Sequence, residues 1–292
     1  MDKAEKIAAI SIPIVILVGI GLALAGSQGG TIFSGLPVFA IGVALAFIMN
    51  WVAFIPAYLQ QTEKFFDLMG GITFISVVVI TVILSPVRDA RSWLLLGMVV
   101  VWAYRLSSFL YKRVHAAGED RRFREIKVSF PRFLLTWTLQ GIWVSFSLAA
   151  ALAAITSEKR LALGTFAVVG FLVWAFGFGF EVIADSQKSQ FKADPANKGK
   201  FIQTGLWSWS RHPNYFGEIV LWVGVAIVAL PILQGWQWVT LISPVFITLL
   251  LTRISGIPML ERRADEKWGG QDDYEAYKAG TSVLIPWPPS KR

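Results

Sequence analysis

The sequence predicts an all-α, polytopic integral membrane protein, a helical bundle of seven to eight transmembrane segments. Of its 292 residues, 55% are hydrophobic and only 16% are charged, whereas soluble domains carry about a quarter of charged residues. The mean hydropathy is +0.57. Thirteen tryptophans fit this class, because Trp is enriched at membrane–water interfaces. The chain has no cysteine, which excludes disulfides, thiolate catalysis and cysteine-based metal sites.

Eight apolar stretches each approach the roughly 20 residues that a membrane-spanning helix needs. They lie near 7–26, 36–58, 70–86, 92–112, 131–155, 162–186, 216–234 and 236–254. The third is short and a tight turn separates the last two, so seven crossings plus a broken one fit equally well. The first stretch has no small-residue cleavage site, which favours a retained helix over a signal peptide. No linker or repeat divides the chain, so we predict a single domain over residues 1–292.

The basic residues concentrate in alternate loops. They lie after the fourth stretch (112–127), after the sixth (188–211) and in the C-terminal tail (262–278), whereas the loops 27–35 and 233–237 carry none. By the positive-inside rule, the basic loops face the cytoplasm and so do both termini of an eight-span chain. This asymmetry accounts for most of the net charge of +8, so the charge gives no reason to expect a nucleic-acid partner.

Four charged residues follow the sixth stretch toward the cytoplasm. Glu181, Asp185, Lys188 and Lys192 are offset by 4, 7 and 11 positions, which places them on one helical face. Carboxylates accept hydrogen bonds from hydroxyl or amide groups, and lysines attract phosphate, so the stripe suits a ligand with both kinds of group. The alternative is intrahelical ion pairing, which contributes only a few tenths of a kcal/mol.

The densest polar cluster precedes the seventh stretch, in residues 204–218. It contains six candidate site residues: Trp207, Arg211, His212, Asn214, Tyr215 and Glu218. Ionisable groups at a membrane face are costly, so a cluster of them indicates a functional site. The alternative is a polar loop that caps a transmembrane helix. The two histidines, His115 and His212, lie in separate loops, so we predict no metal site.

Two further groups lie on the same predicted side. Glu63 and Asp67 are one helical turn apart beside phenylalanines, where the neutral form of a carboxyl is favoured and can donate a hydrogen bond to a carbonyl. An ordinary capping role is the alternative. Tyr104 and Arg105 lie inside the fourth stretch, where Arg105 either snorkels to the interface or has an internal partner.

These motifs resemble the membrane steroid 5-alpha-reductase family. The resemblance rests on Glu181-x-x-x-Asp185, on the segment 211–218, and on a tail with Glu261-Arg262-Arg263, Tyr274-x-x-Tyr277 and Ile285-Pro286. The segment 62–67 resembles a bacterial branch of that family, a domain of unknown function. The match covers roughly residues 55–290.

The resemblance implies an NADPH-dependent reduction of the Δ4 double bond of a 3-oxo-Δ4 steroid or a related enone lipid. It implies that Glu63 polarises the 3-oxo group, with help from Tyr104 if its hydroxyl faces inward. The family's tyrosine position aligns with either Trp102 or Tyr104. The residues implied to hold NADPH are Arg105, Glu181, Asp185, Lys188, Lys192, Trp207, Arg211, His212, Asn214, Tyr215, Glu218, Glu261, Arg262 and Tyr274.

The resemblance also implies a monomer in a bacterial inner membrane. Its cofactor site faces the cytoplasm and its lipophilic substrate enters from the bilayer. Two other classes remain open. An S-adenosylmethionine-dependent methyltransferase of the isoprenylcysteine or phospholipid type shares the Arg-His-Pro-x-Tyr core of residues 211–215 but leaves Glu63 unexplained. A transporter accounts only for the helices, and the chain shows no matched broken helices in two halves.

Overall fold

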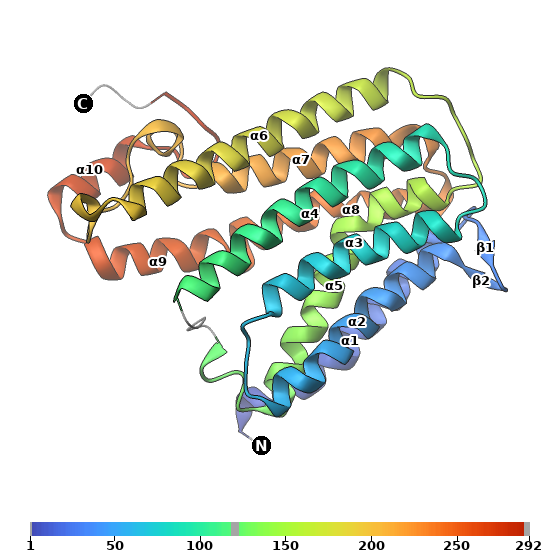
Figure 1. The fold of residues 1–292 in the computed structure, drawn as a ribbon, viewed down its shortest axis with the longest axis horizontal. Coiled ribbons are helices and arrows are strands. Elements are labelled where there is room, and N and C mark those ends of the chain that lie inside the picture. Colours follow the sequence, from blue (N-terminus) through green and yellow to red (C-terminus); the bar gives the residue numbers. More distant parts are fainter. Residues whose placement is uncertain (1, 118–122, 289–292) are drawn as a thin grey trace. The chain divides into compact units, whose positions relative to one another are not determined.

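The structure, a computed structural model, describes residues 2–117 and 123–288. Within these ranges, eight helical segments are long and apolar enough to cross a membrane (Figure 1). The predicted polytopic helical membrane protein is therefore confirmed. The part of the basic loop at residues 118–122, which includes Arg121 and Arg122, lies outside the described residues.

The spans follow the predicted stretches closely. Seven correspond to α1 (Lys3–Gly26), α2 (Val38–Leu59), α3 (Phe66–Leu84), α4 (Ala90–Ala117, apolar to Lys112), α5 (Phe130–Thr156), α6 (Thr165–Ala193) and α7 (Pro213–Ala229), the last extended by the 3-10 helix η4 (Leu230–Ile232). The eighth, Gly235–Trp268, is composite. It joins the 3-10 helix η5 (Gly235–Leu241), α8 (Ile242–Leu249), a π-helical turn η6 (Leu250–Ile254) and α9 (Ile257–Trp268). The helix α10 (Asp272–Gly280) follows.

The internal contacts divide the chain into two compact units. Unit 1 comprises residues 1–167 and 228–243, and unit 2 comprises residues 168–227 and 244–292. Each unit is therefore built from two separate stretches of sequence. The boundaries fall inside or beside apolar helices, so no polar linker marks them. The single domain over residues 1–292 stays a prediction.

Unit 1 is organised around α5, which packs against α1, α2, α3 and α4. From Gly141 onward nearly every residue of α5 is buried, including the five alanines on either side of Leu152 between positions 149 and 154. Small side chains let neighbouring helices approach closely, and in lipid this close packing is a main source of helix association. The small residues of α5 therefore explain why it occupies the centre of the unit.

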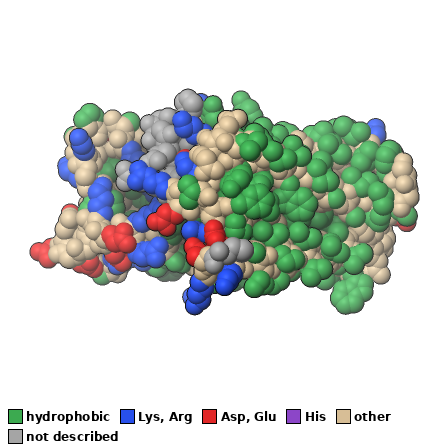
Figure 2. Space-filling model, turned by 90° about the horizontal axis from the view of Figure 1, so that it is seen from below, with side chains coloured by type: hydrophobic (Ala, Val, Ile, Leu, Met, Phe, Trp, Pro, Cys, Tyr) green, Lys and Arg blue, Asp and Glu red, His purple; other side chains and the backbone are tan. Residues whose placement is uncertain are grey.

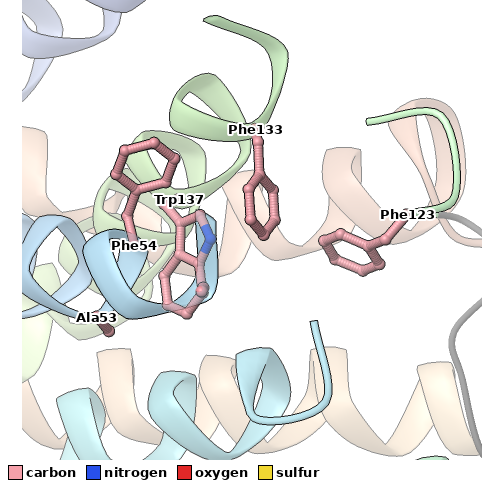
Figure 3. Close-up of a cluster of buried hydrophobic side chains, with 6 residues drawn as sticks. Ala53, Phe54, Phe123, Phe133 and Trp137 are labelled. Atoms are coloured by element: carbon pink, nitrogen blue, oxygen red, sulfur yellow. The ribbon is translucent and has the colours of Figure 1, made fainter. Parts of the chain in front are cut away.

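An aromatic cluster closes one end of unit 1 (Figure 3). Phe133 and Trp137 of α5 pack at nearly perpendicular ring planes with centroids 6.1 Å apart, and Phe123 packs edge-on against Phe133 at 6.2 Å. Phe54 of α2 completes the contact at 5.7 Å from Phe133. Aromatic pairs favour such edge-to-face geometry. The cluster fixes the segment that leads into α5 against the end of α2.

The other end of unit 1 contains a two-stranded hairpin that the sequence analysis did not predict. Strands β1 (Ile32–Phe33) and β2 (Leu36–Pro37) pair antiparallel. The two connecting residues, Ser34 and Gly35, have φ angles of 49° and 83°. Positive φ at both positions is the signature of a type I′ turn, whose twist matches that of the paired strands.

Arg91 ties three segments of unit 1 together at this end. Its side chain is buried, with 2% of the residue exposed. Nη1 donates to the Val228 carbonyl at 2.6 Å, and Nη2 donates to the carbonyls of Leu161 and Ala162 at 3.4 and 3.2 Å. A guanidinium is well suited to this role, because its donors form a rigid planar fork. The residue thus serves the architecture of unit 1.

In unit 2, α6 and α7 touch backbone to backbone. A Cβ on Gly177 would lie 2.5 Å from the Leu221 nitrogen, and one on Gly217 would lie 2.6 Å from the Glu181 nitrogen. A Cβ on Gly224 would lie 2.5 Å from the Trp174 nitrogen. These distances are too short for any side chain, so three glycines at successive levels allow the contact.

Hydrophobic side chains cover a broad, continuous area of the surface in Figure 2. Large apolar residues are exposed along the spans, for example Leu17 of α1 and Leu172 of α6. An exposed apolar area of this extent suits a lipid environment and would be unusual on a soluble monomer.

The role of Arg91 can be tested against Arg88, which is exposed and bonds only to carbonyls five and six residues away. We expect Arg91→Ala to cost about 2–4 kcal/mol, because it leaves the buried Val228 carbonyl without its donor and opens a cavity. Arg88→Ala should cost less than about 1 kcal/mol. Thermal unfolding of the purified protein in detergent compares the two. Equal midpoints for the two variants would contradict the role of Arg91.

The α6–α7 contact can be tested with Gly217→Ala and Gly179→Ala. Both glycines lie in the helix pair, but a Cβ on Gly179 meets nothing within 4 Å. We expect Gly217→Ala to lower the thermal midpoint markedly, because the added methyl group must separate the two backbones. Gly179→Ala should leave the midpoint unchanged or slightly higher, since Ala favours helix. Equal tolerance of both would show that the backbones are not in contact.

Candidate functional site

A cavity of about 460 Å³ lies within unit 2. This volume is within the usual range for small-molecule sites, about 300–1,000 Å³. Its lining comes from the end of α6, the loop 197–202, residues Trp207 to His212, α9 and α10. The cavity therefore lies where the polar ends of the unit 2 helices meet.

One wall of the cavity is aromatic. Phe201 packs against Trp268, Tyr274 and Tyr277 with ring centroids 5.8, 5.2 and 5.4 Å apart. The Tyr277 hydroxyl donates to the Trp207 carbonyl at 2.7 Å, which fixes one end of this wall. Burial, together with the hydrogen bond to Asp265, raises the pKa of Tyr274, so its hydroxyl stays protonated. The wall offers flat apolar faces on which an aromatic ring can stack.

The rest of the lining is strongly basic. It contains seven Lys and Arg side chains but a single carboxylate, that of Glu261. Lys188 lies over the Trp207 ring, with Nζ 4.1 Å from its centroid. The indole of Trp207 is itself anchored by donation to the Ala184 carbonyl at 2.9 Å. Among the described residues, four of the cations form no ion pair: Lys198, Lys200, Arg263 and Lys267. The cavity thus carries excess positive charge that could bind an anionic ligand.

The lone carboxylate holds two neighbouring side chains. Glu261 contacts His212 Nε2 at 2.7 Å through Oε1 and Arg211 Nη2 at 3.2 Å through Oε2. Burial lowers the pKa of His212, and the nearby Lys188 and Arg211 act in the same direction, while the bond to Glu261 opposes them. The lowered pKa favours the neutral form of His212 at pH 7. If Nε2 carries the proton toward Glu261, then Nδ1, which has no partner among the described residues, carries a lone pair.

The buried acids predicted on α6 lie beside the glycine contact. Glu181 and Asp185 are buried, as is Glu218 of α7. Asn214 Nδ2 donates to Asp185 Oδ1 at 3.2 Å, so the first turn of α7 is bonded to α6 directly beyond Gly217. Tyr215 stacks on the His212 ring with centroids 5.7 Å apart. These residues position the cavity wall, but they are not part of its lining.

Seven of the predicted cofactor-binding residues line the cavity: Lys188, Lys192, Trp207, Arg211, His212, Glu261 and Tyr274. Arg262 does not, and its neighbour Arg263 lines the cavity instead. The prediction missed the loop residues Lys198, Lys200 and Phe201 and, on α9, Lys267 and Trp268. In both places a lysine is followed directly by an aromatic residue, and this pairing is the sequence feature that could have indicated them.

The predicted catalytic residues belong to unit 1. Glu63 is buried and forms an ion pair with Lys127, whose Nζ lies 2.7 Å from Oε2. Tyr104 is 69% exposed, so its hydroxyl does not face the interior. Trp102 takes the inward position and packs edge-on against Phe74 at 5.0 Å. Residues two apart on a helix point about 200° apart, which is why only one of the pair can face inward.

Arg105, the remaining predicted site residue, is also in unit 1. It is half-buried, and its guanidinium carbon lies 5.3 Å from the centroid of the Phe109 ring on the same helix. Within the described residues, no group of three or more His, Asp or Glu side chains is arranged to hold a metal ion.

Comparison with known proteins gives one family and two distant relatives. Over 90 residues the chain is 31% identical to a protein of Ustilaginoidea virens named "Probable O-methyltransferase ustE", covering 30% of this chain and 32% of that protein. Over 164 residues it is 21% identical to an uncharacterized protein of Schizosaccharomyces pombe, covering 47% and 48%. The chain thus spans about a third and about half of the length of these relatives. No solved structure matches it.

The comparisons correct one prediction. The assignment to the membrane steroid 5-alpha-reductase family is wrong, because the family that matches is a different one and a relative is named as a methyltransferase. The Arg-His-Pro-x-Tyr core is shared with membrane methyltransferases and did not discriminate. The segment with Glu63 and the stripe from Glu181 to Lys192 favoured the reductase, and they misled the assignment. The matching family covers residues 53–281, well over half of the chain. The chain belongs to DUF1295, a protein family of unknown function.

Proposed function

We propose that this chain is a membrane methyltransferase that transfers a methyl group from S-adenosylmethionine to a lipophilic acceptor bearing an anionic group. The observation that carries the proposal is the composition of the unit 2 cavity, which combines an aromatic wall, unpaired cations and a neutral histidine. The name of the Ustilaginoidea virens relative supports the same reaction class.

The aromatic wall suits the adenine ring of the cofactor. Phe201 presents a ring already held by Trp268 and Tyr277, so a stacking partner meets a rigid surface. A preorganised wall loses little conformational entropy on binding. The cofactor supplies an electrophilic methyl group on a sulfonium.

The unpaired cations suit the acceptor better than the cofactor. S-adenosylmethionine carries a net positive charge and a single carboxylate, so it can neutralise only one of Lys198, Lys200 and Arg263. A carboxylate or phosphate on a lipophilic acceptor would pair with them, and such charge-assisted bonds are roughly twice as strong as neutral ones. We therefore infer that the anionic group that pairs with these cations belongs to the acceptor.

His212 suits a proton transfer. Methylation of a hydroxyl releases a proton, which a nearby base must take up. A neutral imidazole oriented by a carboxylate is such a base, and Glu261 holds His212 in this way. An acceptor that is already ionised needs no base, and His212 would then only shape the cavity.

A second candidate function is NADPH-dependent reduction of an enone lipid. The specific observation in its favour is the same cation excess, because phosphates of a dinucleotide would pair with the lysines that S-adenosylmethionine leaves unused. It leaves the methyltransferase relative unexplained. In the first candidate function the cations bind the acceptor, and in the second they bind the cofactor. Binding experiments can therefore distinguish the two functions.

The basic loops give the orientation that we propose. Lys198, Lys200 and the basic residues of α9 lie on loops and helix ends that the positive-inside rule assigns to the cytoplasm. We infer that the cavity faces the cytoplasm of a bacterial inner membrane, where a soluble cofactor is supplied. The acceptor would enter from the bilayer.

Cofactor binding distinguishes the two candidates. A ligand that binds only the native state raises stability by RT ln(1 + [L]/Kd). We expect S-adenosylmethionine to raise the thermal midpoint of the detergent-purified protein, and NADPH and NADH to leave it unchanged. Stabilisation by NADPH alone would reject methyl transfer and favour reduction. Stabilisation by none of the three would reject both candidates.

Two neighbouring arginines refine this experiment. Arg263 lines the cavity and Arg262 does not. For methyl transfer, Arg263→Ala should leave the midpoint shift caused by S-adenosylmethionine intact and raise the KM of an anionic acceptor about tenfold, the effect of losing one charged bond. For reduction, the same variant should weaken NADPH binding. Arg262→Ala is the matched control and should do neither.

The pH dependence of stability tests the environment of His212. Its pKa lies below the ordinary value of 6.5 because it is buried, so the unfolded chain takes up a proton before the native protein does. Native stability is therefore complete above about pH 7 and falls as the pH drops through the unfolded pKa. We expect the thermal midpoint to fall less steeply in His212→Gln than in the wild type between about pH 7.5 and 5.5. Parallel curves would show that the pKa of His212 is not lowered.

A further inference from the structure

The last described segment of unit 2 is held firmly against residues 209–211. After α10 the chain has no regular secondary structure and bends at residues 283–285, and the Arg211 amide donates to the Ser282 carbonyl at 2.8 Å. The Ser210 hydroxyl donates to the Leu284 carbonyl at 2.9 Å, and the Trp287 amide donates to the Trp209 carbonyl at 3.0 Å. Ser210 is fully buried between the two segments. Three hydrogen bonds over six residues give this segment a fixed face.

The exposed side of this segment is apolar, whereas a surface in contact with water is usually polar. Exposure alternates along the segment, and the outward residues are Val283, Ile285 and Trp287, exposed by 42, 65 and 71%. The intervening Leu284 and Pro286 are less exposed. Trp209, on the facing segment, is 45% exposed. Adjacent large apolar side chains that are exposed together mark a contact with a protein or membrane surface, so this pattern indicates a non-aqueous neighbour.

The position of Trp209 indicates what that neighbour is. It lies four residues before Pro213, where α7 begins a membrane span. The start of a span lies at the membrane surface, and tryptophan is enriched at that level. Because Trp287 is bonded to Trp209 through the backbone, the segment after α10 shares its level.

We propose that the four outward residues, Trp209, Val283, Ile285 and Trp287, form a tail patch that inserts into the headgroup–acyl boundary of the bilayer. The segment after α10 is then an interfacial anchor rather than a tail in water. Because Ser210 also accepts a hydrogen bond from the His212 amide at 3.1 Å, the anchor holds the segment that carries Arg211 and His212. The proposal does not depend on which reaction the cavity performs.

The absence of cysteine makes the test direct, since any introduced cysteine is unique. Nitroxide is attached to Ile285→Cys in the full chain, reconstituted into vesicles of phosphatidylcholine and phosphatidylglycerol. Collision rates with oxygen, which concentrates in lipid, and with a water-soluble nickel chelate report the depth of the label. Leu17→Cys on the exposed face of α1 is the lipid reference. Ala276→Cys on the exposed side of α10 is the aqueous reference.

We expect the oxygen-to-nickel ratio at position 285 to exceed that at position 276 at least several-fold and to approach that at position 17. A ratio equal to that at position 276 would overturn the proposal, because the patch would then face water. Low collision rates with both reagents would also overturn it, because another protein surface, such as a second copy of the chain, would then cover the patch. All three positions carry exposed side chains, so the substitutions leave the packing intact.

Discussion

The direct backbone contact between α6 and α7 is the constraint on which the unit 2 site depends. Gly177, Gly217 and Gly224 remove the side chains that would hold the helices apart, and Asn214 bonds Asp185 where the ladder of glycines ends. Arg211 and His212 lie immediately before α7, so their positions follow from this contact. Lys188 and Lys192 lie further along α6, beyond this contact, and both line the cavity.

The sequence was sufficient for the helices and for half of the predicted site. Hydrophobic length alone located the spans, because lipid leaves the backbone few alternatives to helix. Helical periodicity placed Lys188 and Lys192 together, and both line the cavity. The cluster of residues before α7 was visible because polar residues are rare in such a chain. These features depend on local sequence, which explains why they could be predicted.

The remaining features depend on contacts between distant residues. The aromatic wall joins Phe201 to residues of α9 and α10 more than sixty positions away, and no local pattern indicates such a pairing. The exposure of Tyr104 was undecided because the sequence could not say whether it or Trp102 faced inward. The family was misassigned for a related reason, since short polar patterns such as the segment with Glu63 and the stripe from Glu181 to Lys192 describe local sequence and not a reaction.

Unit 1 is built from two separate stretches of sequence, so it cannot be completed until late in synthesis. Its first stretch ends at residue 167, but residues 228–243 complete it. Until the ribosome has passed residue 228, Arg91 lacks the Val228 carbonyl and Ser157 lacks that of Ile232. The amino-terminal helices therefore enter the bilayer before their own unit can close. Assembly of the first half of the protein waits for synthesis of the second, and the unclosed helices must persist in the membrane during that interval.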